Sequence, residues 1–375
     1  MRVLHINVNY KSTTLHQLMI RQLTAIGIEN QVFVPTYDKS TSNIVPDDNV
    51  KIVECFKKHD RYWFEYKQNK IIKAVEETFD IKSFDLIHAY TLFTDGNCAR
   101  YLSQKYNIPY VVAVRNTDVN AFFKYRIMLR KLGIKILEDA GAVFFLTPVY
   151  RDFLFHKYVP VVKWDKIKSK SHINPNGIDD FWHQHKFTER DYAETEKRLR
   201  RKEVRLVYAG SVDKNKNIKL TVAAMEKMNQ EGWHVTLDVI GPIKDESAYN
   251  DFKDNTDVRY VPKQPKEELI KYYRNADIFV MPSHHETFGL VYAEAMSQGL
   301  PVIYTRGQGF DGQFDEGCVG YSVVDNDPDS VIEKIKMVIA NYRRVSNHCS
   351  TNTNNFNWTN ICGDYKEIYD IIASS

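Results

Sequence analysis

The sequence of 375 residues lacks a cysteine framework, a long apolar run and a signal-like start. Its five cysteines are odd in number, widely scattered and without a CxxC spacing, which argues against a set of disulfides and against a zinc site. No apolar run approaches the roughly 20 residues that span a bilayer, and the initial MRVLHINVNY is typical of a first strand. We therefore expect free structural thiols in a cytoplasmic protein.

A strong net charge is also missing. The 51 basic and 48 acidic residues leave a formal charge of +3, so no global field attracts nucleic acid and no nucleic-acid partner is expected. The first loop, residues 9–18, has neither the GxGxxG of dinucleotide binders nor the GxxxxGK[ST] of P-loop proteins. Its Ser12, Thr13 and Thr14 are interpreted as a helix N-cap. A nicotinamide dehydrogenase and an ATPase are both disfavoured.

Two successive sets of short apolar runs are present, separated by segments of helix length. The first set is VLHINV, QVFVP, VKIVEC, LIHAY, YVVAV and AVFFLT, and the second is VRLVYAG, HVTLDVIG, IFVMP, PVIYT and YSVV. Runs that are polar on neither face indicate parallel strands covered by helices on both sides. The predicted class is therefore α/β, with two doubly wound domains and a ligand in the cleft between them.

The domain boundary is expected near the turn INPNGIDDFW, residues 173–182. A charged stretch follows at 186–202 and is interpreted as a solvated helix with no function of its own.

Two glutamates in the second half, Glu286 and Glu294, lie eight positions apart in HHETFGLVYAEAMSQGLPV. We expect a helix over about 289–298, because Gly299 suits the position after a helix end and Pro301 prevents continuation. Glu286 then lies in the loop before the helix and Glu294 inside it.

The separation of Glu286 and Glu294 limits the kinds of site that the two carboxylates could form. Eight helical residues advance roughly 12 Å and turn roughly 80°, which fits one metal ion poorly and does not favour a glycosidase pair. A long ligand such as a nucleotide sugar fits better. Its pyrophosphate would lie against the amides of Phe288, Gly289 and Leu290, with one glutamate at each hydroxyl-rich end.

The segment PSHHETFGLVYAEAMSQGLPV, residues 282–302, resembles the signature PSxxExFGxxxxEAMxxGxPV of retaining glycosyltransferases of the GT-B fold, family 4 (glycosyl transferases group 1). The resemblance implies two Rossmann-like, doubly wound parallel-sheet domains with a cleft between them. Residues 1–180, completed by a closing helix at 356–375, would bind the acceptor, and residues 181–355 the nucleotide sugar. The implied enzyme is a retaining, metal-independent hexosyltransferase. It would need no cofactor, its co-substrate being a UDP- or GDP-linked sugar.

The same resemblance assigns roles in the donor site. Glu286 would contact the donor sugar and Glu294 the nucleotide ribose, while Lys216 would bind the diphosphate; the alternative for Lys216 is an exposed lysine in a KNKN turn. Donor contacts are also implied for Gly210, Ser211 and Thr287. The family usually has arginine where this chain has serine after that glycine, and Lys214, Arg306 or Arg115 would have to supply the missing charge.

Matches in the first half are looser. Asp118 corresponds to the aspartate of an HGxD segment, whose histidine is replaced by Arg115, and the resemblance implies a catalytic place for both. A guanidinium stays protonated and cannot accept a proton as imidazole does, although it clamps a phosphate well. The alternative for Asp118 is a helix N-cap. His88 is interpreted as a packed residue at a strand end.

For the acceptor, we expect a carbohydrate or lipid-linked glycan, with polysaccharide biosynthesis as the setting. Residues 121–140 combine lysines and arginines with apolar residues, and a basic amphipathic helix here would rest on an anionic membrane at its inner face. The alternative is a domain helix with its apolar face in the core. Residues 156–172 add a second basic stretch.

Two rival functions stay open at this point. One is a non-catalytic nucleotide-sugar-binding subunit, in which Ser211 and Arg115 mark lost chemistry. The other is a sugar-nucleotide epimerase of the same fold.

Overall fold

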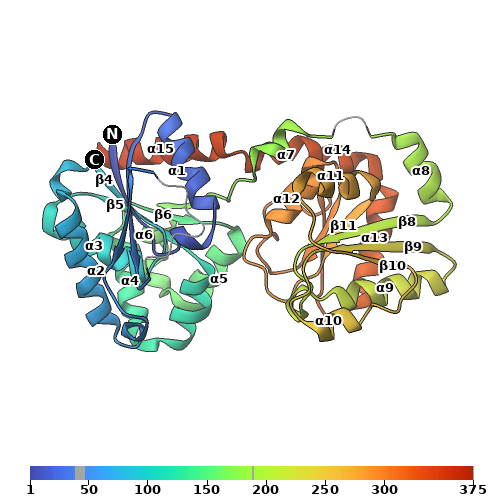
Figure 1. The fold of residues 1–375 in the computed structure, drawn as a ribbon, viewed down its shortest axis with the longest axis horizontal. Coiled ribbons are helices and arrows are strands. Elements are labelled where there is room, and N and C mark those ends of the chain that lie inside the picture. Colours follow the sequence, from blue (N-terminus) through green and yellow to red (C-terminus); the bar gives the residue numbers. More distant parts are fainter. Residues whose placement is uncertain (39–46, 188–189, 375) are drawn as a thin grey trace. The chain divides into compact units, whose positions relative to one another are not determined.

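The computed structural model describes residues 1–38, 47–187 and 190–374, and these divide into two compact units. The first unit comprises residues 1–177 and 358–375, and the second residues 178–357. Each unit has a central parallel sheet with helices on both faces (Figure 1). The chain passes between units at 177–178 and at 357–358, where the sequence placed the boundaries at 180–181 and 355–356.

The sheet of the first unit has seven parallel strands in the order β3-β2-β1-β4-β5-β6-β7. The strands are β1 (Arg2–Ile6), β2 (Glu29–Thr36), β3 (Val50–Glu54), β4 (Leu86–Ala89), β5 (Tyr110–Val114), β6 (Ala142–Phe145) and β7 (Ser171–Ile173). The helices are α1 (Leu15–Ala25), α2 (Phe64–Thr78), α3 (Thr94–Tyr106), α4 (Arg130–Asp139), α5 (Pro148–Tyr158), α6 (Trp164–Lys168) and the closing α15 (Trp358–Ala373). The predicted strands of this half are confirmed, and the sheet gains β7.

The second sheet has six parallel strands in the order β10-β9-β8-β11-β12-β13. These are β8 (Glu203–Ala209), β9 (His234–Ile240), β10 (Val258–Val261), β11 (Ile278–Met281), β12 (Val302–Thr305) and β13 (Gly320–Val323). The helices are α7 (Asp180–Gln184), α8 (Tyr192–Arg200), α9 (Ile218–Gln230), α10 (Glu246–Asn250), α11 (Lys266–Asn275), α12 (Leu290–Ser297), α13 (Pro328–Ala340) and α14 (Tyr342–Asn352). The sequence missed β7 and β10, because three- and four-residue strands at sheet edges carry little apolar signal.

The cores lie between sheets and helices, as the apolar runs predict. In the first unit α15 packs its buried residues onto the same core cluster as α1, so the expected closing helix is confirmed. All five cysteines are free, also as expected. No helix within the described residues is long and apolar enough to cross a membrane.

Three local predictions need correction. Residues 121–140 do not form one helix: a π-helix (Asp118–Phe123) and a 3-10 turn (Ile127–Leu129) precede α4. The charged stretch 186–202 is more than a solvated helix, because the Arg198 guanidinium makes two 2.6 Å bonds to fully buried Asp277; its residues 188 and 189 lie outside the described residues.

The cap of α1 is the third correction. Thr14 occupies the N-cap position without a side-chain cap bond, and the Thr13 hydroxyl instead accepts the Leu15 N–H at 3.2 Å.

Candidate functional site

The strand order of the second sheet reverses between β8 and β11, which lie side by side. In open α/β sheets such a point leaves room for a ligand beyond the carboxyl ends of the two strands. The loop after β8 carries Gly210, Ser211 and Lys216, and the loop after β11 runs from Pro282 to Gly289. The fold therefore brings together two predicted site segments that are about 70 residues apart in the chain.

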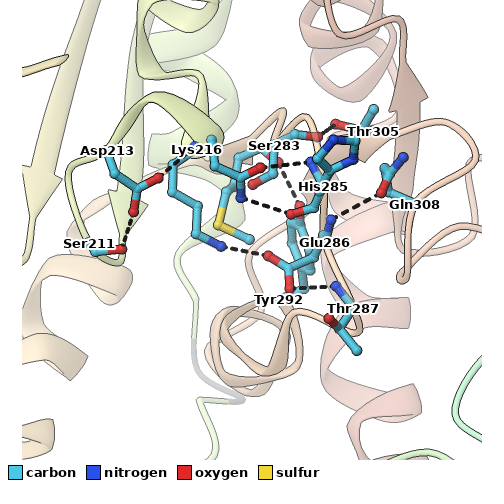
Figure 2. A network of polar contacts seen from close by, with 12 residues as sticks. Ser211, Asp213, Lys216, Ser283, His285, Glu286, Thr287, Tyr292, Thr305 and Gln308 are labelled. Atoms are coloured by element: carbon cyan, nitrogen blue, oxygen red, sulfur yellow. Dashed lines mark hydrogen bonds and ion pairs between the residues drawn. The ribbon is translucent and has the colours of Figure 1, made fainter. Parts of the chain in front are cut away.

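Lys216 and Glu286 meet at this point. The Lys216 ammonium donates to Glu286 Oε2 at 2.7 Å, and Glu286 Oε1 accepts the backbone N–H of Thr287 at 3.0 Å (Figure 2). Both side chains are largely covered but keep 19% and 13% of their surface exposed. The pair thus places a cation and an anion at the surface of the switch point, where an incoming ligand can exchange for either partner.

Asparagines of the KNKN turn hold the glutamate loop in place. Asn215 accepts the His284 and His285 N–H groups through its backbone and side-chain oxygens at 2.8 and 3.0 Å, and its amide returns a bond to the His285 carbonyl. The Asn217 amide donates to the carbonyls of Pro282 and Asp325. Lys216 therefore lies in a turn that is fixed directly to the loop of its partner.

A second support comes from residues that the sequence analysis did not single out. The Gln308 side-chain oxygen accepts the Glu286 N–H at 3.0 Å, and the Gly309 N–H donates to the Glu286 carbonyl at 2.9 Å. A Cβ on Gly309 would come within 2.1 Å of the Thr287 carbonyl oxygen, so only glycine permits this approach. The signal was the RGQG that follows β12.

Helix α12 starts directly after the glutamate loop, as predicted. Gly289 precedes it with φ of +78°, and a Cβ there would lie 2.4 Å from the Tyr292 ring. Among the described residues, the N–H groups of Phe288, Gly289 and Leu290 donate to no acceptor, and no side chain caps the helix. Open amides at a helix start attract an anion.

Glu294 lies one turn into α12 and is partly buried. Burial raises its pKa to about 7, with the Asp179 carboxylate adding to the rise and the Lys266 ammonium opposing it. A pKa in this range lets the carboxyl group change its protonation state near neutral pH. Trp182 is buried beside Glu294, and its indole N–H also opposes the rise of this pKa.

At the start of the loop after β8, Ser211 forms hydrogen bonds with nearby residues. The Ser211 hydroxyl donates to Asp213 at 2.6 Å, and the Ser211 carbonyl accepts the Tyr208 hydroxyl at 2.7 Å. A Cβ on Gly210 would lie 2.7 Å from that same hydroxyl. Of the cations considered as replacements for the family's arginine, Lys214 is 75% exposed and lies 4.0 Å from Asp245. Arg306 is also exposed.

In the first unit, Asp118 is 1% exposed and accepts the N–H groups of Leu92, Phe93 and Arg115 at 2.9 to 3.3 Å. Burial raises its pKa to about 6 against the lowering effect of these bonds. The N-cap interpretation is wrong, because Thr117 holds the cap position and the carboxylate instead ties two loops together. Its catalytic assignment stays a prediction.

Arg115 and His88 have different surroundings. The Arg115 Nε donates to the Tyr90 carbonyl at 3.2 Å, and the residue is partly buried. His88 is fully buried, stacks on the Tyr90 ring and shares a 2.5 Å bond with the Tyr369 hydroxyl. The interpretation of His88 as a packed residue is confirmed.

Comparisons with known proteins find relatives among glycosyltransferases. Residues 190–356 match the family model of glycosyl transferases group 1. The chain is 26% identical over 255 residues to the capsular polysaccharide biosynthesis glycosyltransferase CapM of Staphylococcus aureus, covering 65% of this chain and 64% of CapM. It spans only about a quarter of the D-inositol 3-phosphate glycosyltransferases of Corynebacterium that it also matches.

Solved structures match over the whole chain. Sucrose-phosphate synthase from Thermosynechococcus elongatus superimposes with a TM-score of 0.73 at 20% identity, covering 100% of both chains. Anabaena HepE in complex with UDP and glucose superimposes with a TM-score of 0.65 at 13% identity, covering 99% of each. The chain therefore has the GT-B fold, and its residues 190–356 match the glycosyl transferases group 1 family.

Proposed function

We propose that this protein is a retaining glycosyltransferase of family 4, which moves a sugar from a nucleotide-diphosphate sugar to an acceptor hydroxyl. The observation that carries the proposal is the meeting of Lys216 and Glu286 at the switch point, directly before the open amides of α12. A cation and a helix start suit a diphosphate, and a carboxylate suits sugar hydroxyls.

Each residue then has a role along the donor. The diphosphate lies against the amides of residues 288–290 and draws Lys216 away from Glu286. Glu286, released from the ammonium, accepts bonds from the sugar hydroxyls and orients the sugar. Glu294, further along α12, accepts from the ribose hydroxyls. The loop contacts of Asn215 and Gln308 hold this arrangement before the ligand arrives, so little reorganisation is needed.

In the reaction the bond between the anomeric carbon and the diphosphate oxygen breaks, and the acceptor oxygen bonds to the same face of that carbon. The acceptor proton passes to the departing phosphate oxygen. Charge builds on the diphosphate as the bond breaks, and Lys216 and the helix amides stabilise that charge. We propose that this stabilisation makes a metal ion and a resident cofactor unnecessary.

The acceptor is proposed to be a lipid-linked or surface polysaccharide precursor. Support comes from the likeness to CapM, whose name assigns it to capsular polysaccharide biosynthesis. The likeness to a HepE structure that holds UDP supports a uridine nucleotide as the first donor to test.

The test is incubation of the full chain with a panel of UDP- and GDP-sugars, followed by nuclear magnetic resonance of the products. The proposal expects slow hydrolysis of one donor, release of nucleoside diphosphate and retention of the anomeric configuration, all lost in Glu286→Gln. Release of an epimerised sugar would instead show an epimerase. Tight binding without turnover, even with polyprenyl-linked acceptors, would show a binding subunit.

A further inference from the structure

Exposed apolar side chains gather on three segments of the first unit. Among the described residues, nine of the thirteen exposed large apolar side chains lie in residues 62–66, 125–128 and 153–162. They are Tyr62, Trp63, Tyr66, Tyr125, Ile127, Met128, Phe153, Val161 and Val162. Scattered exposure would be ordinary, but such concentration marks an interaction surface.

Contacts between the segments hold them side by side. The Arg126 guanidinium donates to the Arg61 carbonyl at 2.9 Å, and the Phe64 and Phe122 rings lie 6.2 Å apart. Arg130 joins the second segment to the third, because its guanidinium lies 5.1 Å from the centre of the Tyr158 ring. We call the surface formed by residues 57–67, 122–131 and 153–168 the basic-apolar face.

The backbone forces the apolar groups outward. Between the π-helix and the 3-10 turn, Arg126 takes φ of −101° and ψ of 66°, which interrupts the helix. Met128 is then 92% exposed and Ile127 63% exposed. The apolar face of the following α4 is used in the core instead, through Ile134, Ile136 and Leu137. The exposed side chains of Ile127 and Met128 are therefore not part of the hydrophobic core.

Packed aromatic rings lie beneath these exposed side chains. Phe122 stacks on Phe93 with ring centres 4.7 Å apart, and Phe123 stacks on Tyr158 at 5.1 Å. Phe93 and Phe123 are fully buried. The side chains at 125–128 therefore stand on packed rings and do not fold back into the core.

The charge of this face differs from that of the chain. Its 37 residues contain 12 lysines and arginines but three acidic residues, whereas the whole chain has 51 and 48. One of the three, Asp60, is 1% exposed and paired with Lys70, so it adds little negative charge to the surface. Protruding apolar tips among exposed cations complement an anionic interface with an apolar layer beneath it.

We propose that the basic-apolar face binds the surface of an anionic lipid bilayer. Val161, Val162, Ile127 and Met128 enter the layer below the headgroups, the tyrosines and Trp63 lie at headgroup depth, and the lysines and arginines contact lipid phosphates. The inference goes beyond glycosyl transfer and needs no donor, so its success or failure is measured separately from that of the proposed function.

The test is sedimentation of the full chain with vesicles of phosphatidylcholine alone or mixed equally with phosphatidylglycerol. The native protein is expected to sediment with the anionic vesicles at low salt and much less with the neutral ones. A variant with Ile127→Ser, Met128→Ser, Val161→Ser and Val162→Ser should bind at least about tenfold more weakly. Its matched control replaces exposed apolar residues elsewhere, Val324→Ser with Ile371→Ser, and should bind as the native protein does.

Charge reversal gives an independent arm. Lys124→Glu with Lys131→Glu should weaken anionic binding about tenfold or more, since each basic residue near such a surface contributes about 1 kcal/mol. Lys253→Glu with Lys263→Glu, on the second unit, is the control with the same change in net charge. All substituted side chains are exposed, so thermal unfolding should be unchanged in every variant.

Three results would overturn the proposal. The native protein fails to bind anionic vesicles at low salt, or the four-serine variant binds as well as its control. Alternatively, ultracentrifugation shows a dimer that the four-serine variant disperses while no vesicle binding occurs, which would assign the face to a second copy of the chain.

Discussion

The carboxylates that the sequence singled out in the two halves, Glu286 and Asp118, are held in opposite ways. Glu286 is 13% exposed and is paired with the Lys216 side chain. Asp118 is 1% exposed and accepts three backbone N–H groups. A side-chain partner can move to a ligand at small cost, whereas three backbone amides would be left buried and unbonded. We therefore expect the carboxylate to serve a ligand in the second unit and to stabilise the fold in the first.

The largest effect is expected for Glu286→Gln. The amide keeps the shape but loses the charge that orients the donor sugar, so kcat/KM should fall by roughly 10³-fold. The midpoint of thermal unfolding should change little, because the glutamine oxygen can still accept a bond from the Lys216 ammonium or the Thr287 N–H. Donor turnover within a few-fold of the native rate would contradict the role of Glu286.

Asp118→Ala should act on stability. Three buried N–H groups lose their acceptor, so the free energy of unfolding in urea should drop by about 3 kcal/mol or more. Asp118→Asn, which keeps one acceptor oxygen, should cost less. If Asp118→Ala unfolds like the native protein yet loses all turnover, the carboxylate is catalytic and the comparison fails.

Lys216→Ala should lower kcat/KM by roughly 10²-fold through lost stabilisation of the leaving diphosphate. Lys216→Arg should recover part of the rate, since it restores the charge. Lys214→Ala is the matched control: this neighbour is 75% exposed and should change the rate about twofold at most. Equal losses at the two lysines would indicate a diffuse charge effect instead of a specific site.

The smallest effect concerns pH. Burial raises the pKa of Glu294 to about 7. In the proposed donor complex, only the ionised form of Glu294 would accept bonds from both ribose hydroxyls. Donor affinity should therefore rise with pH, by about tenfold between one unit below and one unit above that value. Calorimetry at both pH values measures it. Glu294→Gln should bind more weakly at high pH and show a flat profile; a native profile in this variant would move the titrating group elsewhere.

Much of the second unit was predictable because its signals are local. Gly299 and Pro301 mark the end of α12, so the positions of Glu286 before the helix and Glu294 inside it followed from short-range rules. The contacts between different loops could not be predicted from the sequence. That Asn215 and Gln308 would fix the Glu286 loop depends on the lateral order of β8, β11 and β12, which no local pattern encodes.

The first unit was harder for a physical reason. Asp118 matched a motif, but its surroundings depend on the loop that ends β4, 25 residues earlier in the chain. Helical periodicity over 121–140 was real, yet the break at Arg126 lies in the backbone and not in the apolar pattern. Some apolar residues of that segment are therefore buried in the core and others are exposed, and the sequence pattern alone does not distinguish them.

The most direct test is a crystal structure of the protein soaked with UDP or GDP. The account predicts phosphate oxygens within hydrogen-bond distance of the amides of Phe288, Gly289 and Leu290, with the Lys216 ammonium moved from Glu286 to the diphosphate. A nucleotide bound elsewhere on the second unit, with the Lys216–Glu286 pair intact, would contradict it.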